Sequence, residues 1–216
     1  MDQNLNEMDQ ERSRIYELFG RLWLELPQKE LVVQSQEGFW KGFPVPVDND
    51  QMTRGIDELL KWSEASKNYS VEETVTELRS DYAKLFIGPA TVEAPPWESV
   101  YRSKRKNVFG LQTYAVRDFF HRFGLELTRK NKEPDDHIGL ELLFMSYLID
   151  CISNQKFEEQ ELIKAQSQFL EEHILTWISD FSNDVQKNAN TPFYRGLALL
   201  CEGFVTMDKQ NLQVLI

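Results

Sequence analysis

The chain has 216 residues, of which 41% are hydrophobic, so it can bury a substantial core in one large domain or two small ones. The 35 acidic residues outnumber the 24 basic ones and give a formal net charge of −11. This balance argues against a nucleic-acid partner, because phosphates are bound by basic faces, and against an anionic membrane surface. It favours a cationic ligand, or serves solubility alone.

Targeting and redox features indicate a cytoplasmic protein without membrane insertion. The first residues are acidic and polar, whereas a secretory signal needs a basic start and an apolar run. The longest apolar stretch, 138–152, contains Glu141 and Asp150 and is too short and too charged to span a bilayer. The two cysteines, Cys151 and Cys201, form no CxxC pair, which suits a reducing compartment in which both are buried thiols.

Helical spacing of apolar residues begins near the N-terminus. A first helix from Ile15 to Leu26 is expected to end at Pro27. Residues 28–50 are less regular and contain glycines and prolines, so we expect a loop there. A second helix is predicted over residues 52–66.

Sequence signals mark both ends of the next predicted helix. Ser70 is a good N-cap, and Glu73 three residues later completes a capping box. The Gly88-Pro89 pair is expected to stop this helix, and residues 88–98 to form a loop stiffened by prolines.

The C-terminal half also shows helical spacing. We predict helices over residues 107–123, with Gly124 as a left-handed terminator, and from His137 to about Ser153, apolar on most sides and therefore central. Residues 160–187 are amphipathic, and Thr191-Pro192 is expected to open the last helix.

No alternating strand pattern, internal repeat, low-complexity tract or convincing linker interrupts this sequence. We therefore predict one compact all-α domain over residues 1–216, with about eight to twelve helices.

The sequence contains no recognisable set of catalytic or metal-binding residues. The three histidines, His121, His137 and His173, lack HxxxH or HExxH spacing, and Asp118-x-x-His121 has no second copy to complete a di-iron site. Neither a Walker loop nor a Gly-x-Gly-x-x-Gly run occurs. We expect no metal, no cofactor and no enzymatic activity.

An unusual concentration of charge precedes the apolar helix. Glu133-Pro134-Asp135-Asp136-His137 holds three carboxylates and an imidazole. Asp135 or Asp136 is expected to cap the helix that follows, because a carboxylate there accepts hydrogen bonds from free backbone N–H groups. A cap needs only one carboxylate, so the other is available to bind a guest, and His137 can hydrogen-bond a ligand or orient a carboxylate.

A second block joins a double proline to Trp97 and Glu98. An aromatic ring beside a carboxylate is a suitable seat for a guanidinium group. Plain core packing of Trp97 is the alternative.

A stripe of like charge runs along the helix that begins after Ser70. Glu73, Glu77 and Asp81 recur every four residues, which costs a few tenths of a kcal/mol per pair unless a cation neutralises them, a role that Lys84 could take at Asp81. A solvated helix face explains Glu73 and Glu77, whereas Asp81 lies beside Tyr82 near the proline loop.

Taken together, these blocks resemble the TorD/DmsD family of redox enzyme maturation chaperones. The resemblance rests on the Pro-Trp-Glu-Ser-Val-Tyr run at 96–101, the Glu-Pro-Asp-Asp-His run at 133–137 and the Asp81-Tyr82-Ala83-Lys84-Leu85-Phe86 segment. It is strong over residues 80–147 and elsewhere rests on length and helical character.

The resemblance implies an all-α cytoplasmic chaperone that binds the twin-arginine signal peptide of a molybdopterin-containing oxidoreductase precursor. Such a chaperone delays export until the cofactor is inserted and the enzyme has folded. The family permits monomers and domain-swapped dimers, and it has been linked to guanine nucleotide, for which this sequence has no motif.

Seven residues are carried over as a signal-peptide-binding site. Three match family positions implicated in peptide binding, and four lie in the matched motifs and are expected to shape the same pocket. The first group is Asp81, Asp136 and His137, and the second is Trp97, Glu98, Pro134 and Asp135.

Two other functions stay open at this point. Asp136 and His137 could act as acid and base in an enzyme that handles a nucleotide or another small molecule, or the chain could assist a redox enzyme that is not exported. The basic patch of Arg102, Lys104, Arg105 and Lys106 is a solvated turn or a contact for a phosphate-bearing or acidic partner.

Overall fold

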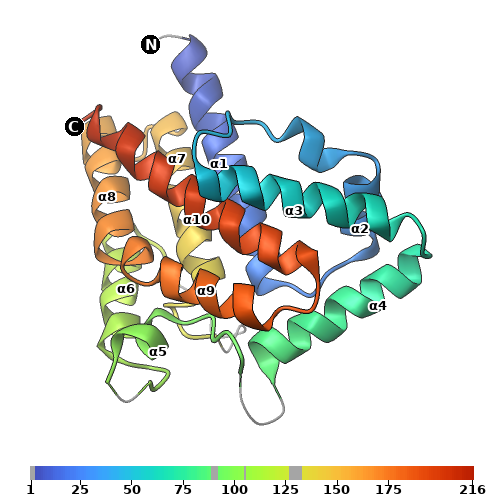
Figure 1. The fold of residues 1–216 in the computed structure, drawn as a ribbon. Coiled ribbons are helices and arrows are strands. Elements are labelled where there is room, and N and C mark those ends of the chain that lie inside the picture. Colours follow the sequence, from blue (N-terminus) through green and yellow to red (C-terminus); the bar gives the residue numbers. More distant parts are fainter. Residues whose placement is uncertain (1–2, 89–91, 105, 127–132) are drawn as a thin grey trace. The chain divides into compact units, whose positions relative to one another are not determined.

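The computed structural model describes residues 3–88, 92–104, 106–126 and 133–216 (Figure 1). These residues form ten α-helices and no β-strand, so the prediction of an all-α fold is confirmed for them. They divide into two compact units: residues 1–24, 96–177 and 208–216 make the first, and residues 25–95 and 178–207 the second. A single domain over residues 1–216 stays a prediction.

The first unit contains most of the sequence blocks singled out above. It holds α1 (Gln3–Leu24), α5 (Glu98–Arg102), α6 (Leu111–Arg122), α7 (Ile138–Ser153), α8 (Glu159–Glu172), the 3-10 helix η3 (Ile174–Thr176) and the final turns of α10 (Pro192–Gln213). Helices α1 and α7 approach closely where two glycines face each other, since a Cβ atom on Gly20 would lie 2.8 Å from the carbonyl oxygen of Gly139. This contact fixes the first turn of α7 against α1.

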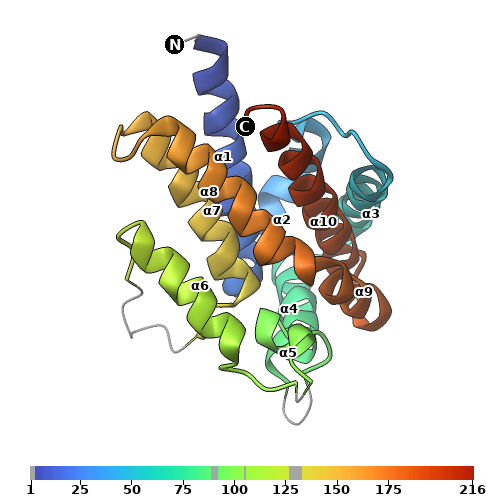
Figure 2. The ribbon, with the colours of Figure 1, turned by 90° about the vertical axis from the view of Figure 1, so that its left-hand side faces the viewer.

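Aromatic side chains join α6, α7 and α8, which run alongside one another in Figure 2. The ring of Phe144 on α7 lies 4.5 Å from that of Phe120 on α6 and 4.9 Å from that of Phe169 on α8. Phe119 also contacts Phe169 at 5.1 Å. Tilted and edge-on ring pairs stabilise a core by more than the burial of their apolar surface alone. These ring contacts therefore hold α6 firmly against α7 and α8.

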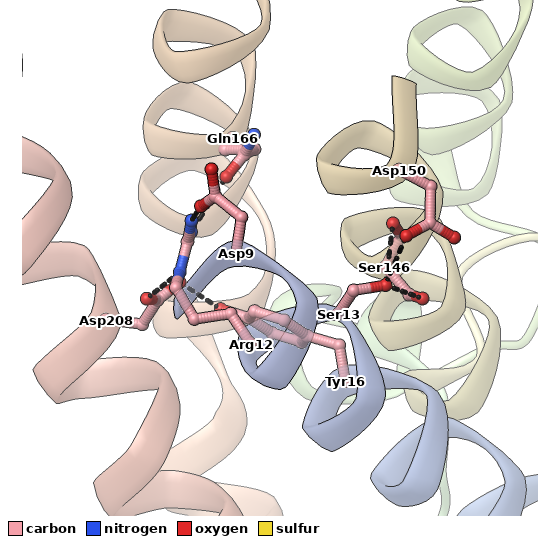
Figure 3. A network of polar contacts seen from close by, with 8 residues as sticks. All are labelled: Asp9, Arg12, Ser13, Tyr16, Ser146, Asp150, Gln166 and Asp208. Carbon is pink, nitrogen blue, oxygen red and sulfur yellow. Dashed lines mark hydrogen bonds and ion pairs between the residues drawn. The ribbon is translucent and has the colours of Figure 1, made fainter. Parts of the chain in front are cut away.

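A polar network joins α1, α8 and the end of α10 within this unit (Figure 3). The guanidinium of Arg12 donates to Asp208 at 2.7 and 3.0 Å and to Gln166 at 2.8 Å, and the Tyr16 hydroxyl donates to Asp208 at 2.8 Å. Burial by itself would lower the pKa of Arg12, but the charge and hydrogen bonds of Asp208 outweigh burial and raise it. Arg12 is therefore always charged, and Asp208 is its principal counter-ion.

The second unit holds the remaining helices. They are α2 (Lys29–Gln36), the 3-10 helix η1 (Phe39–Gly42), α3 (Asp50–Ser66), α4 (Val71–Tyr82), the π-helix η2 (Ala83–Ile87), α9 (Ile178–Asn188) and α10 as far as Met207.

Several local predictions are confirmed. Ser70 and Glu73 form both halves of the capping box, Gly124 takes a φ of 74°, and the last helix begins at Pro192. Cys151 and Cys201 are both buried. Within the described ranges, no helix is both long enough and apolar enough to cross a membrane.

Several boundaries differ from those that the sequence indicated, and α1 already begins at Gln3. The expected loop over residues 28–50 contains α2 and η1, whose short apolar faces gave a weak periodic pattern. The helix predicted from Asn107 begins at Leu111, after Phe109 at a φ of 64°. The amphipathic stretch 160–187 is three elements, because His173 has a non-helical backbone at φ −117° and ψ −86°. Gly88 ends η2 as expected, with a φ of 56°, while Pro89 lies outside the described residues.

Removing the charge of Asp208 should reduce stability far more than removing the charge of Asp9, the other acidic partner of Arg12. Asp208→Asn leaves the guanidinium of Arg12 buried without its main counter-ion, so we expect a cost of about 3–5 kcal/mol in the free energy of unfolding. Asp9, which also bonds Arg12 but has a side chain 25% exposed, is the matched control, and Asp9→Asn should cost less than about 1 kcal/mol. Equal losses in urea denaturation would contradict this ranking.

Candidate functional site

The two sequence blocks meet in the first unit at a short backbone bridge. Trp97 and His137 form an isolated antiparallel β-bridge. The N–H of Glu98 donates to the Asp136 carbonyl at 3.0 Å, and the N–H of Ile138 donates to the Pro96 carbonyl at 2.9 Å. The rings of Trp97 and His137 lie 6.1 Å apart, edge to face. Backbone pairing therefore fixes the start of α5 beside the start of α7.

His137, rather than an aspartate, caps α7. Its Nδ1 accepts a hydrogen bond from the N–H of Gly139 at 3.0 Å, which corrects the prediction that Asp135 or Asp136 would do so. Because the imidazole is fully enclosed, burial lowers the pKa of His137 to about 3. The ring is therefore neutral at neutral pH, as the cap requires, since a protonated Nδ1 cannot accept a hydrogen bond.

Asp136 caps a different helix from the one that follows it. Its Oδ2 accepts from the N–H of Ser99 at 2.8 Å, and its Oδ1 accepts from the hydroxyl of Thr113 at 2.7 Å. Ser99 lies in the first turn of α5, where backbone donors have no helical partner. The fully buried carboxylate of Asp136 thus joins α5, α6 and the segment before α7.

Asp135 lies at the edge of this network. Its side chain is 8% exposed, and Oδ2 accepts from Nε of Arg117, whose side chain is 41% exposed. The guanidinium of Arg117 also lies 5.6 Å from the ring centre of Tyr114. The neighbouring Pro134 is buried, and its carbonyl accepts from the N–H of His137 at 3.1 Å.

Glu98 is buried, and both of its carboxylate oxygens contact a polar partner. One carboxylate oxygen accepts from Nη1 of Arg102, and the other lies 2.9 Å from Nδ1 of His173. Arg102 also donates to the carbonyl of Glu172 at 2.8 Å. This network holds the imidazole of His173 toward α5 at the residue where α8 ends.

Glu141 is a member of this site that the sequence analysis missed. Its Oε2 accepts from the indole N–H of Trp177 at 3.3 Å, and the side chain is fully buried. Burial, followed by the charges of Glu98 and Asp136, raises the pKa of Glu141 well above its ordinary value. A carboxylate in an otherwise apolar helix, four residues after His137, was the available signal.

One carboxyl oxygen of Glu141, Oε1, has no hydrogen-bond partner among the described residues. A protonated carboxyl group can donate a hydrogen bond from such an atom, and the burial and neighbouring charges that raise the pKa of Glu141 favour the protonated form. Separate hydrogen bonds join Glu141 to Trp177, and Glu98 to His173 and Arg102.

Asp81 lies in the second unit, apart from the other six predicted site residues in the division of the chain. Its buried carboxylate accepts from the N–H groups of Asn190 and Thr191 at 3.0 and 2.7 Å and from the Thr191 hydroxyl at 2.7 Å. It therefore anchors the two residues that precede α10. Lys84, expected beside Asp81, donates instead to Asn188 and Asn190.

The geometry does not favour acid–base chemistry. Asp136 and His137 bond to separate partners, and both are fully enclosed. Across the described ranges, no cluster of three or more histidine, cysteine, aspartate or glutamate side chains is arranged to hold a metal ion. The arrangement is that of a buried acidic scaffold with one carboxylate, Asp135, at its edge beside an arginine.

The family described as "Nitrate reductase delta subunit" matches residues 48–183, and the chain belongs to that family. A crystal structure described as a putative redox enzyme maturation protein from Archaeoglobus fulgidus has the same fold, with a TM-score of 0.54 and 19% identity over 90% of this chain and 93% of that one.

Curated relatives confirm the resemblance to the TorD/DmsD family. The chain is 36% identical over 130 residues to the "Probable Tat proofreading chaperone DmsD" of Haemophilus influenzae, covering 60% of this chain and 58% of that protein. It is 31% identical over 135 residues to the "Tat proofreading chaperone DmsD" of Salmonella typhimurium, covering 62% and 61%. It is 24% identical over 208 residues to the "Chaperone protein TorD" of Aliivibrio salmonicida, covering 94% and 95%. The matches thus span about three fifths of the length of the two DmsD relatives.

Replacing Asp136 should destabilise the first unit. In Asp136→Asn the amide can accept only one of the two hydrogen bonds and carries no charge, so we expect a loss of about 2–3 kcal/mol in the free energy of unfolding. Asp118→Asn, an exposed change of the same chemistry on α6, should change stability by less than about 0.5 kcal/mol. Urea denaturation measures both, and a stability of Asp136→Asn equal to that of the wild type would refute the capping role.

The raised pKa of Glu141 should make the stability of the protein depend on pH. Its ordinary pKa is 4.5 and its folded pKa is higher, so above pH 4.5 the unfolded chain releases a proton that the folded chain keeps. Folded wild type should therefore lose stability as pH rises toward the folded pKa, by up to about 1.4 kcal/mol per pH unit. Glu141→Gln mimics the protonated acid and lacks this loss.

The measurement is urea denaturation of both proteins from pH 5 to 8. The stability of Glu141→Gln relative to the wild type should increase with pH. Infrared spectra at neutral pH should also show a protonated carboxyl band in the wild type that Glu141→Gln lacks. Parallel stability curves, or the absence of that band from the wild type, would contradict the assignment.

Proposed function

We propose that this chain is a cytoplasmic chaperone that binds the twin-arginine signal peptide of a redox enzyme precursor and delays export until the enzyme has matured. The observation that carries the proposal is the position of Asp135 at the junction of the two motif blocks, where its carboxylate binds a guanidinium group. The family and the chaperones named among the relatives support the same function. A molybdopterin-containing oxidoreductase is the client class we propose.

The electrostatics of the chain suit a cationic guest. With a net charge of −11, it attracts a peptide whose defining residues are two arginines. A carboxylate matches the planar fork of a guanidinium better than it matches a lysine ammonium group. Asp135 therefore provides selectivity for arginine as well as attraction.

An apolar surface on α6 suits the hydrophobic segment of a signal peptide. Leu111 is 83% exposed and Tyr114 is 56% exposed, and their spacing of three residues places them on one helix face. Arg117, the partner of Asp135, follows three residues later. An extended guest could place an arginine at Asp135 and apolar side chains along α6.

The predicted site residues then have different roles. We propose that Asp135 contacts the guest, and that the others hold its seat in place through the bridge and the buried hydrogen bonds; these are Trp97, Glu98, Pro134, Asp136 and His137. Direct peptide binding by Asp81 stays a prediction, and its contacts with Asn190 and Thr191 support an indirect role.

The alternatives are less well supported. An enzyme using Asp136 and His137 is not favoured, because each has its own structural partner and the reported relatives are named chaperones. A chaperone for a non-exported redox enzyme would share this scaffold without binding a twin-arginine peptide. Guanine nucleotide binding and the choice between a monomer and a domain-swapped dimer stay predictions.

Calorimetry with twin-arginine leaders from the same genome tests the function. We expect binding at low salt, weaker binding of a twin-lysine version, and a loss of about tenfold, or ~1.4 kcal/mol, in Asp135→Asn. Asp118→Asn, with the same change in charge on α6, should lose much less. If no leader binds at low salt, the proposed function fails; if Asp118→Asn loses as much as Asp135→Asn, only the seat is wrong.

A further inference from the structure

The carboxylate proposed to receive a guest arginine already binds an arginine of the chain itself. Nε of Arg117 donates to Oδ2 of Asp135, and the guanidinium lies 5.6 Å from the ring centre of Tyr114. A carboxylate together with an aromatic ring is a complete guanidinium seat. In this structure the seat is occupied from within.

A second arginine in the same unit forms an ion pair that can be compared with that of Arg117. Arg102 bonds both Glu98 and the carbonyl of Glu172, and Glu98 is fully buried with its other oxygen near His173. Among the described residues, Asp135 is the one acceptor that bonds Arg117, whose side chain is 41% exposed. Both arginine side chains are partly exposed, Arg102 to 35% and Arg117 to 41%. Arg102 is nevertheless held by two acceptors, whereas Arg117 is held by one.

Exchange at Asp135 carries a small electrostatic penalty, because a guest guanidinium replaces Arg117 with the same chemistry. The nearly buried carboxylate is therefore never left without a partner. The displaced guanidinium can be solvated, because long cationic side chains reach water while their stems stay on the surface.

We propose that Arg117 is an internal placeholder for a guest arginine, and that a twin-arginine peptide binds by displacing it from the seat formed by Asp135 and Tyr114. This inference rests on the proposed function and adds an autoinhibitory contact to it. The placeholder keeps the empty site paired and lowers the apparent affinity for weak cationic competitors, since only the fraction of molecules with an open seat can bind.

The direct test compares Arg117→Gln with Arg122→Gln. Both remove one positive charge from α6, but Arg122 lies over the rings of Phe119 and Phe123 rather than on Asp135. We expect Arg117→Gln to bind the twin-arginine leader about two- to fivefold tighter than wild type, as release of a weak ion pair allows, and Arg122→Gln to bind like the wild type. In an Asp135→Asn background the gain from Arg117→Gln should vanish.

Ethylguanidinium provides a readout that does not depend on the peptide. Titrated against a sodium chloride control, it should shift the ring resonances of Tyr114 in Arg117→Gln and leave them unchanged in the Asp135→Asn, Arg117→Gln double variant. Equal peptide affinities of Arg117→Gln and Arg122→Gln, or no Tyr114 shift in Arg117→Gln, would overturn the placeholder. Failure of the leader to bind any variant, together with a Tyr114 shift, would instead count against the proposed function alone.

Discussion

The buried carboxylate of Asp136 determines the geometry of the whole candidate site. Its two oxygens hold the first turn of α5 and a threonine of α6, while its carbonyl pairs with Glu98 beside the Trp97–His137 bridge. One residue thus joins three segments that are distant in sequence. A buried charge is tolerated only when its hydrogen bonds are satisfied, so the positions of these segments depend on one another.

Two kinds of acid follow from this constraint. Glu98, Asp136 and Glu141 are fully buried, and each accepts at least one hydrogen bond from inside the protein. Asp135 differs because its own side chain is 8% exposed, whereas that of Glu98 is 0% exposed. We propose that the interior acids hold the site in place and that Asp135 contacts the guest.

Much of the fold followed from the sequence because helical signals are local. The capping box at Ser70 and the apolar period of α7 each depend on residues within one or two turns. The surroundings of His173, where α8 ends, could not be predicted in the same way, because its partner Glu98 is remote in sequence. The short helix α2 was not predicted, because eight residues are too few to show a helical period that distinguishes them from a loop.

The motif blocks indicated which segments lie together, because the structure joins Trp97 to His137 by a backbone bridge; a role of these residues in peptide binding stays a prediction. The hydrogen bonding within the blocks was not predicted, since the cap of α7 was assigned to an aspartate, which is the commoner N-cap. His137 takes that role since Asp136 is already engaged by Ser99 and Thr113. Glu141 was passed over because nothing in a single sequence tells a buried glutamate from an exposed one.

The decisive experiment is a structure of the chain in complex with a twin-arginine leader. We expect a leader guanidinium on the Asp135 carboxylate, Arg117 displaced toward solvent, and Asp136 still bonded to Ser99 and Thr113. A leader whose arginines bind elsewhere, with Arg117 still on Asp135, would contradict it.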